Sequence, residues 1–249
     1  QGYEAIRAAI LARQIELGLL PADTELSPIN PHGEPGTTGP DGQAWPQLDT
    51  VRPWDTLSED EQRLFARMAE VFAGYISHSD HQLGRVLDYL EDSGQLDNTL
   101  IVVISDNGAS GEGGPNGSFN EWRFFNGVAD TTASTLPHID ELGTPASYNH
   151  YCTGWAWAFD TPFPYWKRWA GYEGGVADMC LLAWPKQIKP SEEVRHQYIH
   201  AVDIVPTARN RSSPSPTSHS ASLARCTAER RGIRCICARW RTSSVADSS

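Results

Sequence analysis

A continuous apolar run at residues 99–105 constrains the fold of this chain more than any other stretch of its sequence. Its residues are mostly β-branched, which is typical of a buried strand in a parallel sheet covered on both faces. A long helical pattern precedes the run, since Ser58 and Glu61 form a capping box and apolar residues then recur at helical spacing as far as Leu90. A helix, a short turn and a buried strand predict an α/β fold, with the sheet sandwiched between helices.

The rest of the chain adds further predicted elements around one long connection. Apolar spacing predicts an amphipathic helix over residues 3–17 and a short helix over residues 165–169. Residues 179–184 predict a second buried strand, and a further helix begins at residues 200–207. Residues 108–164 are rich in Gly, Asn and aromatic side chains, and loops of this length in compact domains are usually functional.

Charge divides the chain into an acidic body and a basic tail. The formal net charge is −11 over 249 residues, but residues 208–249 contain eight Arg, no Lys and only two acids. The preceding residues therefore carry −17, and a body this acidic repels the phosphates of nucleic acids. We therefore expect no nucleic-acid partner. No apolar run approaches the roughly 18 residues that span a bilayer, so we also expect no membrane span. The oligomeric state and the compartment stay open, the latter between the cytoplasm and the periplasm of a bacterium.

The basic tail also differs from the body in residue type. It contains ten Ser and three of the five Cys, with almost no aliphatic periodicity. One interpretation is a disordered tail. The other is out-of-frame translation of a GC-rich gene, because the composition changes where a helix should continue. We therefore expect one domain over residues 1–207 and an atypical tail over residues 208–249.

Two oxygen-bearing side chains, Asp106 and Asn107, stand directly after the predicted strand. In open α/β sheets, ligands bind just beyond the carboxyl ends of the strands. A carboxylate and an amide oxygen favour a hard cation such as Ca²⁺ or Mg²⁺ over zinc, and Gly108 permits a sharp turn behind them. The alternative is an ordinary Asp-Asn-Gly turn without a bound ion.

A second candidate is Lys167, which stands among aromatic residues shortly before Gly174 and Gly175. An ammonium close to a Gly-Gly turn can face a tetrahedral oxyanion as a point charge. The alternative is a solvated Lys-Arg pair on an aromatic helix face.

These motifs occur in an order that resembles the formylglycine-dependent sulfatases of the alkaline phosphatase-like superfamily. The resemblance covers roughly residues 1–207 and rests on several blocks: residues 12–26, 83–90, 96–108, 161–175, 184–186 and 202–207. The first block is similar to bacterial arylsulfatases in particular. The resemblance implies a large α/β domain with a mixed sheet between helices, and the hydrolysis of small-molecule sulfate esters.

The resemblance also assigns roles to the candidate residues. Asp106 and Asn107 match the family's calcium ligands, with Mg²⁺ as an alternative ion. Lys167 matches the lysine that contacts the sulfate and the ester oxygen. The calcium implied in this way acts as a Lewis acid, and the lysine stabilises the charge that develops on the leaving oxygen.

The long connection offers further residues for a site. Trp155, Trp157 and Phe159 either form an apolar wall for an aromatic leaving group or pack in the core. His138 and His150 either line a pocket or are ordinary polar loop residues. The sequence alone does not choose between these alternatives.

The chain also departs from the family pattern. No Cys-x-Pro-x-Arg sequence occurs, although in the family that Cys becomes the formylglycine whose hydrate attacks sulfur. We therefore expect the C-terminal part of a catalytic domain, an incomplete fold and no sulfatase turnover by this chain alone, with the formylglycine in a missing N-terminal part. Two alternatives stay open: a phosphodiesterase or phosphonate hydrolase of the same superfamily, and a catalytically inactive truncated product.

Overall fold

The computed structural model describes residues 2–30, 49–128, 130–190, 194–195, 198–211, 226–227, 234–237 and 239–240. The chain forms two compact units. Unit 1 combines Gln1–Leu83 with Ala109–Gly174, and unit 2 combines Gly84–Gly108 with Gly175–Ser249. The chain therefore leaves unit 1, returns to it, and ends in unit 2.

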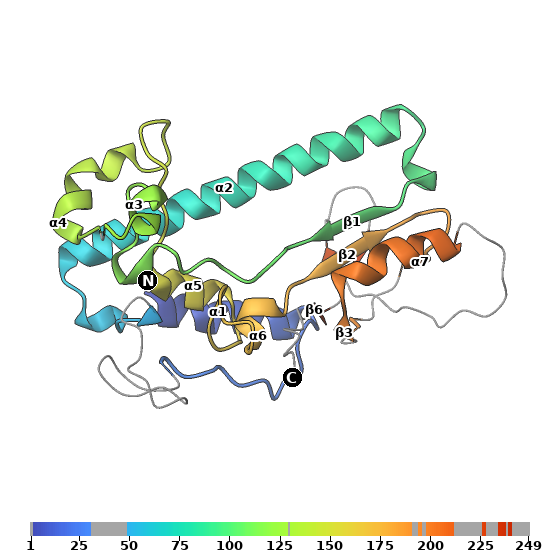
Figure 1. Ribbon diagram of the computed structural model, residues 1–249. Coiled ribbons are helices and arrows are strands. Elements are labelled where there is room, and N and C mark those ends of the chain that lie inside the picture. The colour runs from blue at the N-terminus through green and yellow to red at the C-terminus, as the bar shows by residue number, and fades with distance from the viewer. Residues whose placement is uncertain are drawn as a thin grey trace, which may run out of the picture. The chain divides into compact units, whose positions relative to one another are not determined.

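Unit 1 is built mostly from helices (Figure 1). α1 (Tyr3–Glu16) confirms the predicted N-terminal helix, and the chain turns away from it at Gly18, whose φ is 68°. The last carbonyls of a helix have no hydrogen-bond partner within the helix. The Leu19 amide donates to one of them, the Gln14 carbonyl, over 2.8 Å. α1 packs along α5 (Thr153–Phe159), and Figure 1 shows the two side by side.

α2 (Glu59–Asp92) is one unbroken helix of 34 residues, and most of it belongs to unit 1. The predicted capping box is confirmed. The Ser58 amide donates to the Glu61 carboxylate over 2.9 Å, and the Glu61 amide donates to the Ser58 hydroxyl over 3.3 Å. Leu64, Phe65 and Met68 on its inward face are fully buried, so the start of α2 anchors the core of unit 1.

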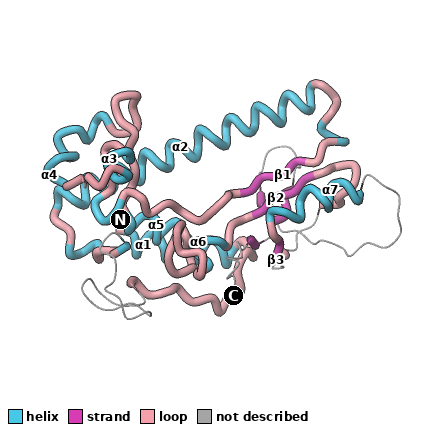
Figure 2. The backbone as a smooth tube through the Cα atoms, in the orientation of Figure 1, coloured by secondary structure: helices cyan, strands magenta, loops and turns pink. Residues whose placement is uncertain are grey.

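The predicted loop at residues 108–164 is only partly a loop. It contains α3 (Glu121–Phe125), α4 (Thr132–Thr135) and α5, joined by irregular segments that Figure 2 shows as loops. Several short 3₁₀ helices occur along the chain, at Trp54–Thr56, Leu96–Asn98, Gly114–Asn116, Leu136–Glu141 and Ala201–Asp203.

α5 carries aromatic residues that belong to the core. Trp155 and Trp157 are 3% and 5% exposed, and the ring centroids of Trp155 and Tyr3 lie 5.2 Å apart. This close packing requires Gly154, because a Cβ there would lie 2.4 Å from a ring carbon of Tyr3. Phe159 stacks on Phe72 with ring centroids 4.8 Å apart. The interpretation of these residues as a wall for a leaving group is therefore wrong, and the core alternative is correct.

Unit 2 holds a small sheet. β1 (Ile101–Ile104) pairs antiparallel with β2 (Cys180–Ala183), and Figure 1 shows the two strands side by side. These two strands belong to a four-stranded sheet with the strand order β1-β2-β5-β4, in which β5 is Arg234–Cys237 and β4 is Cys226–Thr227. A separate parallel pair joins β3 (Tyr198–Ile199) to β6 (Arg239–Trp240). α7 (Ile204–Arg211) confirms the helix predicted near the end of the body, and α6 (Glu173–Val176) is a single turn where the chain re-enters unit 2.

Both predicted strands are confirmed, but the predicted parallel setting of β1 is wrong. β1 is half-buried and Ile104 is 40% exposed, which differs from a strand covered on both faces. A short apolar run indicates burial but does not fix the direction of the neighbouring strand. The described elements combine helices with strands, which agrees with the predicted α/β fold class at the level of element types.

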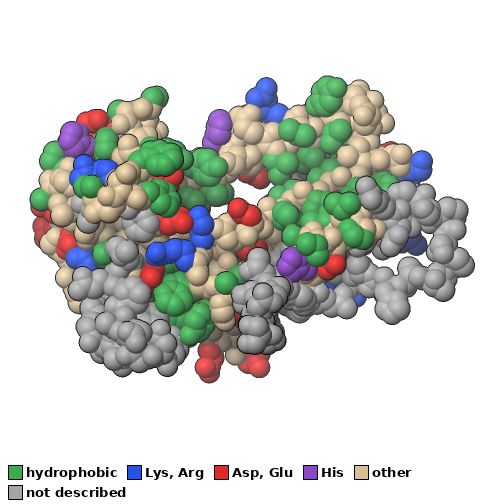
Figure 3. All heavy atoms as spheres, in the orientation of Figure 1, with side chains coloured by type: hydrophobic (Ala, Val, Ile, Leu, Met, Phe, Trp, Pro, Cys, Tyr) green, Lys and Arg blue, Asp and Glu red, His purple; other side chains and the backbone are tan. Residues whose placement is uncertain are grey.

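The basic tail adds the end of α7 and the backbone of three short strands to the described residues. A disordered or out-of-frame origin for residues 208–249 stays a prediction that the coding DNA would test. None of the described helices has the length and apolar character needed to cross a bilayer. On the face shown in Figure 3, acidic and basic side chains of the described residues are interspersed.

Candidate functional site

Asp106 and Asn107, the predicted metal ligands, follow β1 in unit 2. The strand end leaves Asp106 exposed and Asn107 half-buried. The Asn107 side-chain amide donates to the Asp106 carboxylate, and the Ser105 hydroxyl donates to the Asn107 backbone carbonyl over 2.8 Å. The two side chains are therefore neighbours in direct contact.

A third oxygen donor, Asp178, lies near this pair, and the sequence does not single it out. The antiparallel register of β1 and β2 ends with Ile104 opposite Cys180, and Asp106 and Asp178 each stand two residues beyond these partners. Burial raises the pKa of Asp178 to about 6, and the negative charge of Asp106 adds to the rise. Recognition of the antiparallel pairing would have revealed this residue.

The oxygen donors in unit 2 are of the type that a hard cation prefers, but they provide only part of its coordination shell. Carboxylate and amide oxygens are the ligands that Ca²⁺ prefers, and Ca²⁺ takes about 6–8 of them. Asp106, Asn107 and Asp178 provide such oxygens on two facing strand ends. Within the part of the chain that the structure describes, no group of three or more His, Cys, Asp and Glu side chains is placed so that it could hold a metal ion. A divalent ion held here would therefore need further donors, such as water.

Lys167 lies in unit 1, where its ammonium donates to the Glu112 carboxylate over 2.9 Å. The Glu112 side chain is 13% exposed and that of Lys167 is 38% exposed, so the pair lies at the edge of solvent. The Ser110 hydroxyl donates to the same carboxylate oxygen. Burial acts to raise the pKa of Glu112, but the bonds from Ser110 and Lys167 outweigh it and leave that pKa below its usual value. Glu112 is therefore ionised at neutral pH and positions the Lys167 head group.

The backbone around Lys167 is a turn, so the short helix predicted there is wrong. Tyr165 and Arg168 have φ values of 62° and 85°, left-handed conformations that residues other than glycine seldom adopt. The Lys167 amide donates to the Ala109 carbonyl over 2.9 Å and not to a carbonyl one helical turn earlier. The aromatic pattern that suggested a helix arises from core packing, since Trp166 is only 2% exposed.

Two features of the packing fix this turn. The Arg168 guanidinium pairs with the Asp49 carboxylate, whose side chain is 7% exposed. Gly111 permits a close approach of two segments, because a Cβ there would lie 2.1 Å from the Trp166 indole nitrogen. The Lys167 head group is therefore presented by a backbone that is held in place from both sides.

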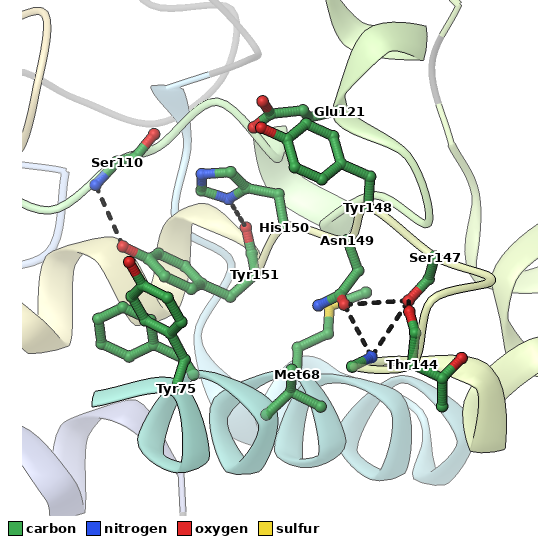
Figure 4. A pocket seen from close by; sticks show the side chains of 13 residues that line it. Met68, Tyr75, Ser110, Glu121, Thr144, Ser147, Tyr148, Asn149, His150 and Tyr151 are labelled. Carbon is green, nitrogen blue, oxygen red and sulfur yellow. Dashed lines mark hydrogen bonds between the residues drawn. The ribbon is translucent and has the colours of Figure 1, made fainter. Parts of the chain in front are cut away.

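Lys167, Glu112 and Ser110 together form the Lys167 cluster. A pocket of about 540 Å³ opens next to this cluster in unit 1, and Figure 4 shows its lining. Ser110 belongs to both, since its hydroxyl contacts Glu112 and its amide donates to the Tyr151 hydroxyl over 3.1 Å. The lining residues come from α2 and from the connection between β1 and α5: Met68, Val71, Phe72, Tyr75, Ser110, Glu121, Gly143, Thr144, Ser147, Tyr148, Asn149, His150 and Tyr151.

His150 lines this pocket, whereas His138 is not among the lining residues and bonds the Glu141 carboxylate over 2.8 Å. His150 Nδ1 donates to the Tyr151 carbonyl over 3.0 Å. Burial lowers the pKa of His150, against the opposing effect of nearby carboxylates that include Glu112. The His150 ring is therefore neutral at pH 7.

Comparison with known proteins shows the family. The sequence model of the Sulfatase family matches residues 26–210, which is most of the chain. This chain belongs to the sulfatase family. Membership implies an alkaline phosphatase-like α/β fold for the sulfatase as a whole.

Several curated proteins are similar to this sulfatase chain. An uncharacterized sulfatase of Schizosaccharomyces pombe is 29% identical over 214 residues, which cover 83% of this chain and 33% of the relative. An arylsulfatase of Klebsiella aerogenes is 24% identical over 207 residues, which cover 83% of this chain and 39% of the relative. A multifunctional alkaline phosphatase superfamily protein of Trinickia caryophylli is 45% identical over 53 residues, 21% of this chain and 10% of the relative. The chain thus spans 33% of the length of the first relative and 39% of the length of the second.

The predicted site residues of this sulfatase chain fall into separate units. Asp106 and Asn107 lie in unit 2, Lys167 lies in unit 1, and each is placed by contacts within its own unit. Their roles stay predictions. Sequence reasoning missed Ser110 and Glu112, because the contact between Glu112 and Lys167 joins residues 55 positions apart and leaves no local signal.

Proposed function

We propose that this chain is part of an enzyme that hydrolyses sulfate esters of small molecules. The observation that carries the proposal is the Lys167 ammonium, held at a fixed turn by a largely buried carboxylate in a chain of the sulfatase family. A cation positioned in advance stabilises a developing oxyanion without reorganisation during the reaction. A relative that bears the name arylsulfatase supports the same substrate class.

Hydrolysis consumes water, breaks the S–O ester bond and yields inorganic sulfate and an alcohol. In this proposal Lys167 contacts the sulfate and stabilises the negative charge that develops on the leaving oxygen. An ammonium has three N–H donors, so its bond to Glu112 is compatible with further bonds to an anion. The group that attacks sulfur is proposed to be a formylglycine outside the present sequence, which contains no Cys-x-Pro-x-Arg.

We also propose that Asp106 and Asn107 hold a divalent cation, with Ca²⁺ preferred over Mg²⁺. Their oxygen donors support the proposal, and so does the presence of a second carboxylate, Asp178, close to Asp106. A bound ion of this kind supplies Lewis-acid polarisation of the sulfate oxygens.

Calorimetric titration of this chain with calcium chloride tests the cation site. The double variant Asp106→Ala, Asn107→Ala should lose at least about tenfold in calcium affinity, since two of its ligands are gone. The matched control is Asp92→Asn, which removes an exposed acid at the end of α2 in the same unit and should leave the affinity unchanged. Equal calcium affinities in all three proteins would remove both residues from the site.

A second candidate function is the hydrolysis of phosphodiesters or phosphonates. The observation that favours it is the 45% identity with a multifunctional alkaline phosphatase superfamily protein, over 53 residues. A tetrahedral phosphate ester carries a similar charge and suits the same cationic group.

Kinetics of the full-length parent enzyme separate the two candidates. We expect hydrolysis of 4-nitrophenyl sulfate to exceed that of bis(4-nitrophenyl) phosphate, and Lys167→Ala to lower kcat by about 10²–10³. Lys186→Ala removes an exposed lysine of unit 2 and serves as the control. Unchanged kcat in Lys167→Ala would remove that lysine from the site, and faster hydrolysis of the phosphate diester would favour the second candidate.

A further inference from the structure

The pocket beside the Lys167 cluster has aromatic walls. Phe72 and Tyr75 line it from α2, and Tyr148 and Tyr151 line it from the segment that precedes α5. The ring centroids of Phe72 and Tyr151 lie 4.9 Å apart, with the ring planes at 71° to each other. Tyr75 and Tyr148 are 64% and 55% exposed, so a large part of each ring is open to a ligand. Aromatic rings from two separate segments therefore line one space (Figure 4).

The Glu121 carboxylate also belongs to this lining. It accepts a hydrogen bond from the Tyr148 hydroxyl, and Figure 4 shows the two side chains together. A hydroxyl is neutral, so this bond orients the carboxylate without cancelling its charge. Among the described residues, no Lys or Arg forms an ion pair with Glu121. The pocket therefore holds an uncompensated negative charge beside an aromatic ring.

Positive charge near the pocket is already neutralised. Three cationic side chains of unit 1 form ion pairs with N···O distances of 2.8–2.9 Å: Lys167 with Glu112, Arg123 with Asp130, and Arg67 with Glu70. None of these three cations lines the pocket. His150 does line it, but burial lowers the pKa of His150 and keeps its ring neutral at pH 7. The described lining thus offers a ligand no positive charge to oppose the charge of Glu121.

Aromatic rings and a carboxylate together select one class of ligand. The face of an aromatic ring carries partial negative charge and attracts a cation that lies within about 6 Å of the ring centroid. A potassium ion has no apolar surface to bury, whereas the methyl groups of an alkylammonium ion pack against the rings. A neutral molecule of the same size packs in the same way but gains nothing from the charge of Glu121. The lining therefore favours an alkylated cation over both.

We propose that this pocket is a binding site for a small organic cation of the alkylammonium class, held by the aromatic rings and by the Glu121 carboxylate. The proposal does not depend on the proposed function, because the groups that carry it line the pocket and none of them is assigned to sulfate hydrolysis. A volume of about 540 Å³ lies within the usual size of small-molecule sites and exceeds what a tetramethylammonium ion needs. The acidic body of the chain also attracts cations from solution.

The alkylammonium group can belong to two kinds of ligand. Ser110 lines the pocket, and its hydroxyl donates to the Glu112 carboxylate that also binds the Lys167 ammonium. A free cation would use the pocket alone. A zwitterion would place its ammonium group in the pocket and its anionic group at Lys167. Only the second kind of ligand depends on Lys167, so the two can be told apart.

The two methionines of the chain allow a direct test. Met68 lines the pocket in unit 1, whereas Met179 lies in unit 2 and is 52% exposed. In a chain labelled with methyl-¹³C methionine, titration with tetramethylammonium chloride should shift the Met68 methyl signal saturably and leave the Met179 signal in place. Potassium chloride controls for ionic strength, and neutral tert-butanol controls for size. We expect each of these two to bind at least about tenfold more weakly.

Matched variants locate the response. Glu121→Gln removes the charge and should weaken tetramethylammonium binding about tenfold, whereas Glu25→Gln changes an exposed carboxylate of unit 1 outside the pocket and should have no effect. Tyr75→Ala removes one ring and should weaken binding about two- to fivefold. Its control is Tyr89→Ala, because Tyr89 is 68% exposed on the same helix and does not line the pocket. A Met68 signal that ignores tetramethylammonium, an equal response to tert-butanol, or equal losses in a variant and its control would overturn the proposal.

A zwitterionic probe identifies the kind of ligand. The compound 3-(trimethylammonio)propane-1-sulfonate carries the same alkylammonium group and a sulfonate that resists hydrolysis. If the ligand is a zwitterion, Lys167→Ala should weaken this probe relative to tetramethylammonium about five- to tenfold; if it is a free cation, the ratio should stay the same. In both cases Glu121→Gln should weaken both probes. Normal binding of both probes to Glu121→Gln would overturn the cation site.

Discussion

A buried arginine on α1 supports the segment that leads to Lys167, and its replacement gives a demanding test of the fold of unit 1. The Arg7 side chain is fully buried and donates to the backbone carbonyls of Trp157, of Pro162 over 2.7 Å and of Phe163 over 2.8 Å. Its guanidinium carbon also lies 4.3 Å from the centroid of the Trp157 ring. Burial lowers the pKa of Arg7 to about 10, which still leaves the side chain charged at neutral pH.

The substitution Arg7→Met keeps the length of the side chain but removes every donor. Each hydrogen bond from a charged donor contributes roughly 1.5–3 kcal/mol, and three carbonyls, two of them buried, would lose such a partner. Removal of a buried charge recovers part of this, because the ion no longer has to leave water. We therefore expect a loss of about 3 kcal/mol in the free energy of unfolding of unit 1.

Urea denaturation followed by tryptophan fluorescence measures this loss. The matched control is Arg13→Met on the same helix, because the Arg13 side chain is 59% exposed and pairs with Glu16, which is also exposed. A surface pair of this kind contributes less than about 1 kcal/mol, so the control should shift the midpoint little. A loss below about 1 kcal/mol in Arg7→Met, or equal losses in both variants, would refute the reasoning.

Two further predictions concern the turn that carries Lys167. Gly111→Ala should destabilise unit 1 by about 1–3 kcal/mol, because the added Cβ would overlap the Trp166 indole. The control Gly74→Ala on α2 has open space around the added Cβ and should stabilise the protein slightly. Similar midpoints of thermal unfolding in the two variants would contradict this prediction. Since the pKa of Glu112 is lowered on folding, its contribution to stability is present above its ordinary pKa and is lost as the pH falls through the lowered value. Glu112→Gln should therefore reduce the free energy of unfolding at pH 7 by at most about 0.5 kcal/mol, because Lys167 is partly exposed, and the reduction should be smaller at pH 3. Urea titrations at both pH values measure this difference. An equal loss at the two pH values would show that the charge of Glu112 is not responsible.

Local patterns in the sequence predict local structure in this protein. The capping box at Ser58 and Glu61 locates the start of α2, and the apolar runs locate both β1 and β2. These elements depend on spacing and on hydrogen bonds between near neighbours, which a sequence displays directly.

Contacts between distant residues are the part that the sequence did not reveal. Asp178 becomes a neighbour of Asp106 only through the antiparallel register of two strands. Glu112 meets Lys167 only because an irregular turn is held against the segment that follows β1. The aromatic residues of α5 similarly suggested a ligand wall, although burial against Tyr3 explains them.

The pairing of Lys167 with Glu112 has a consequence for how an anion reaches and leaves unit 1. Together the two side chains have no net charge, so beyond a Debye length of about 8 Å they exert little attraction on an anion. The body of the protein is acidic and mildly repels a sulfate ester in solution. If a sulfate ester binds at Lys167 as proposed, selection therefore occurs at contact and not by steering, and added salt should speed association slightly. The sulfate product of the proposed reaction should then dissociate readily and inhibit weakly.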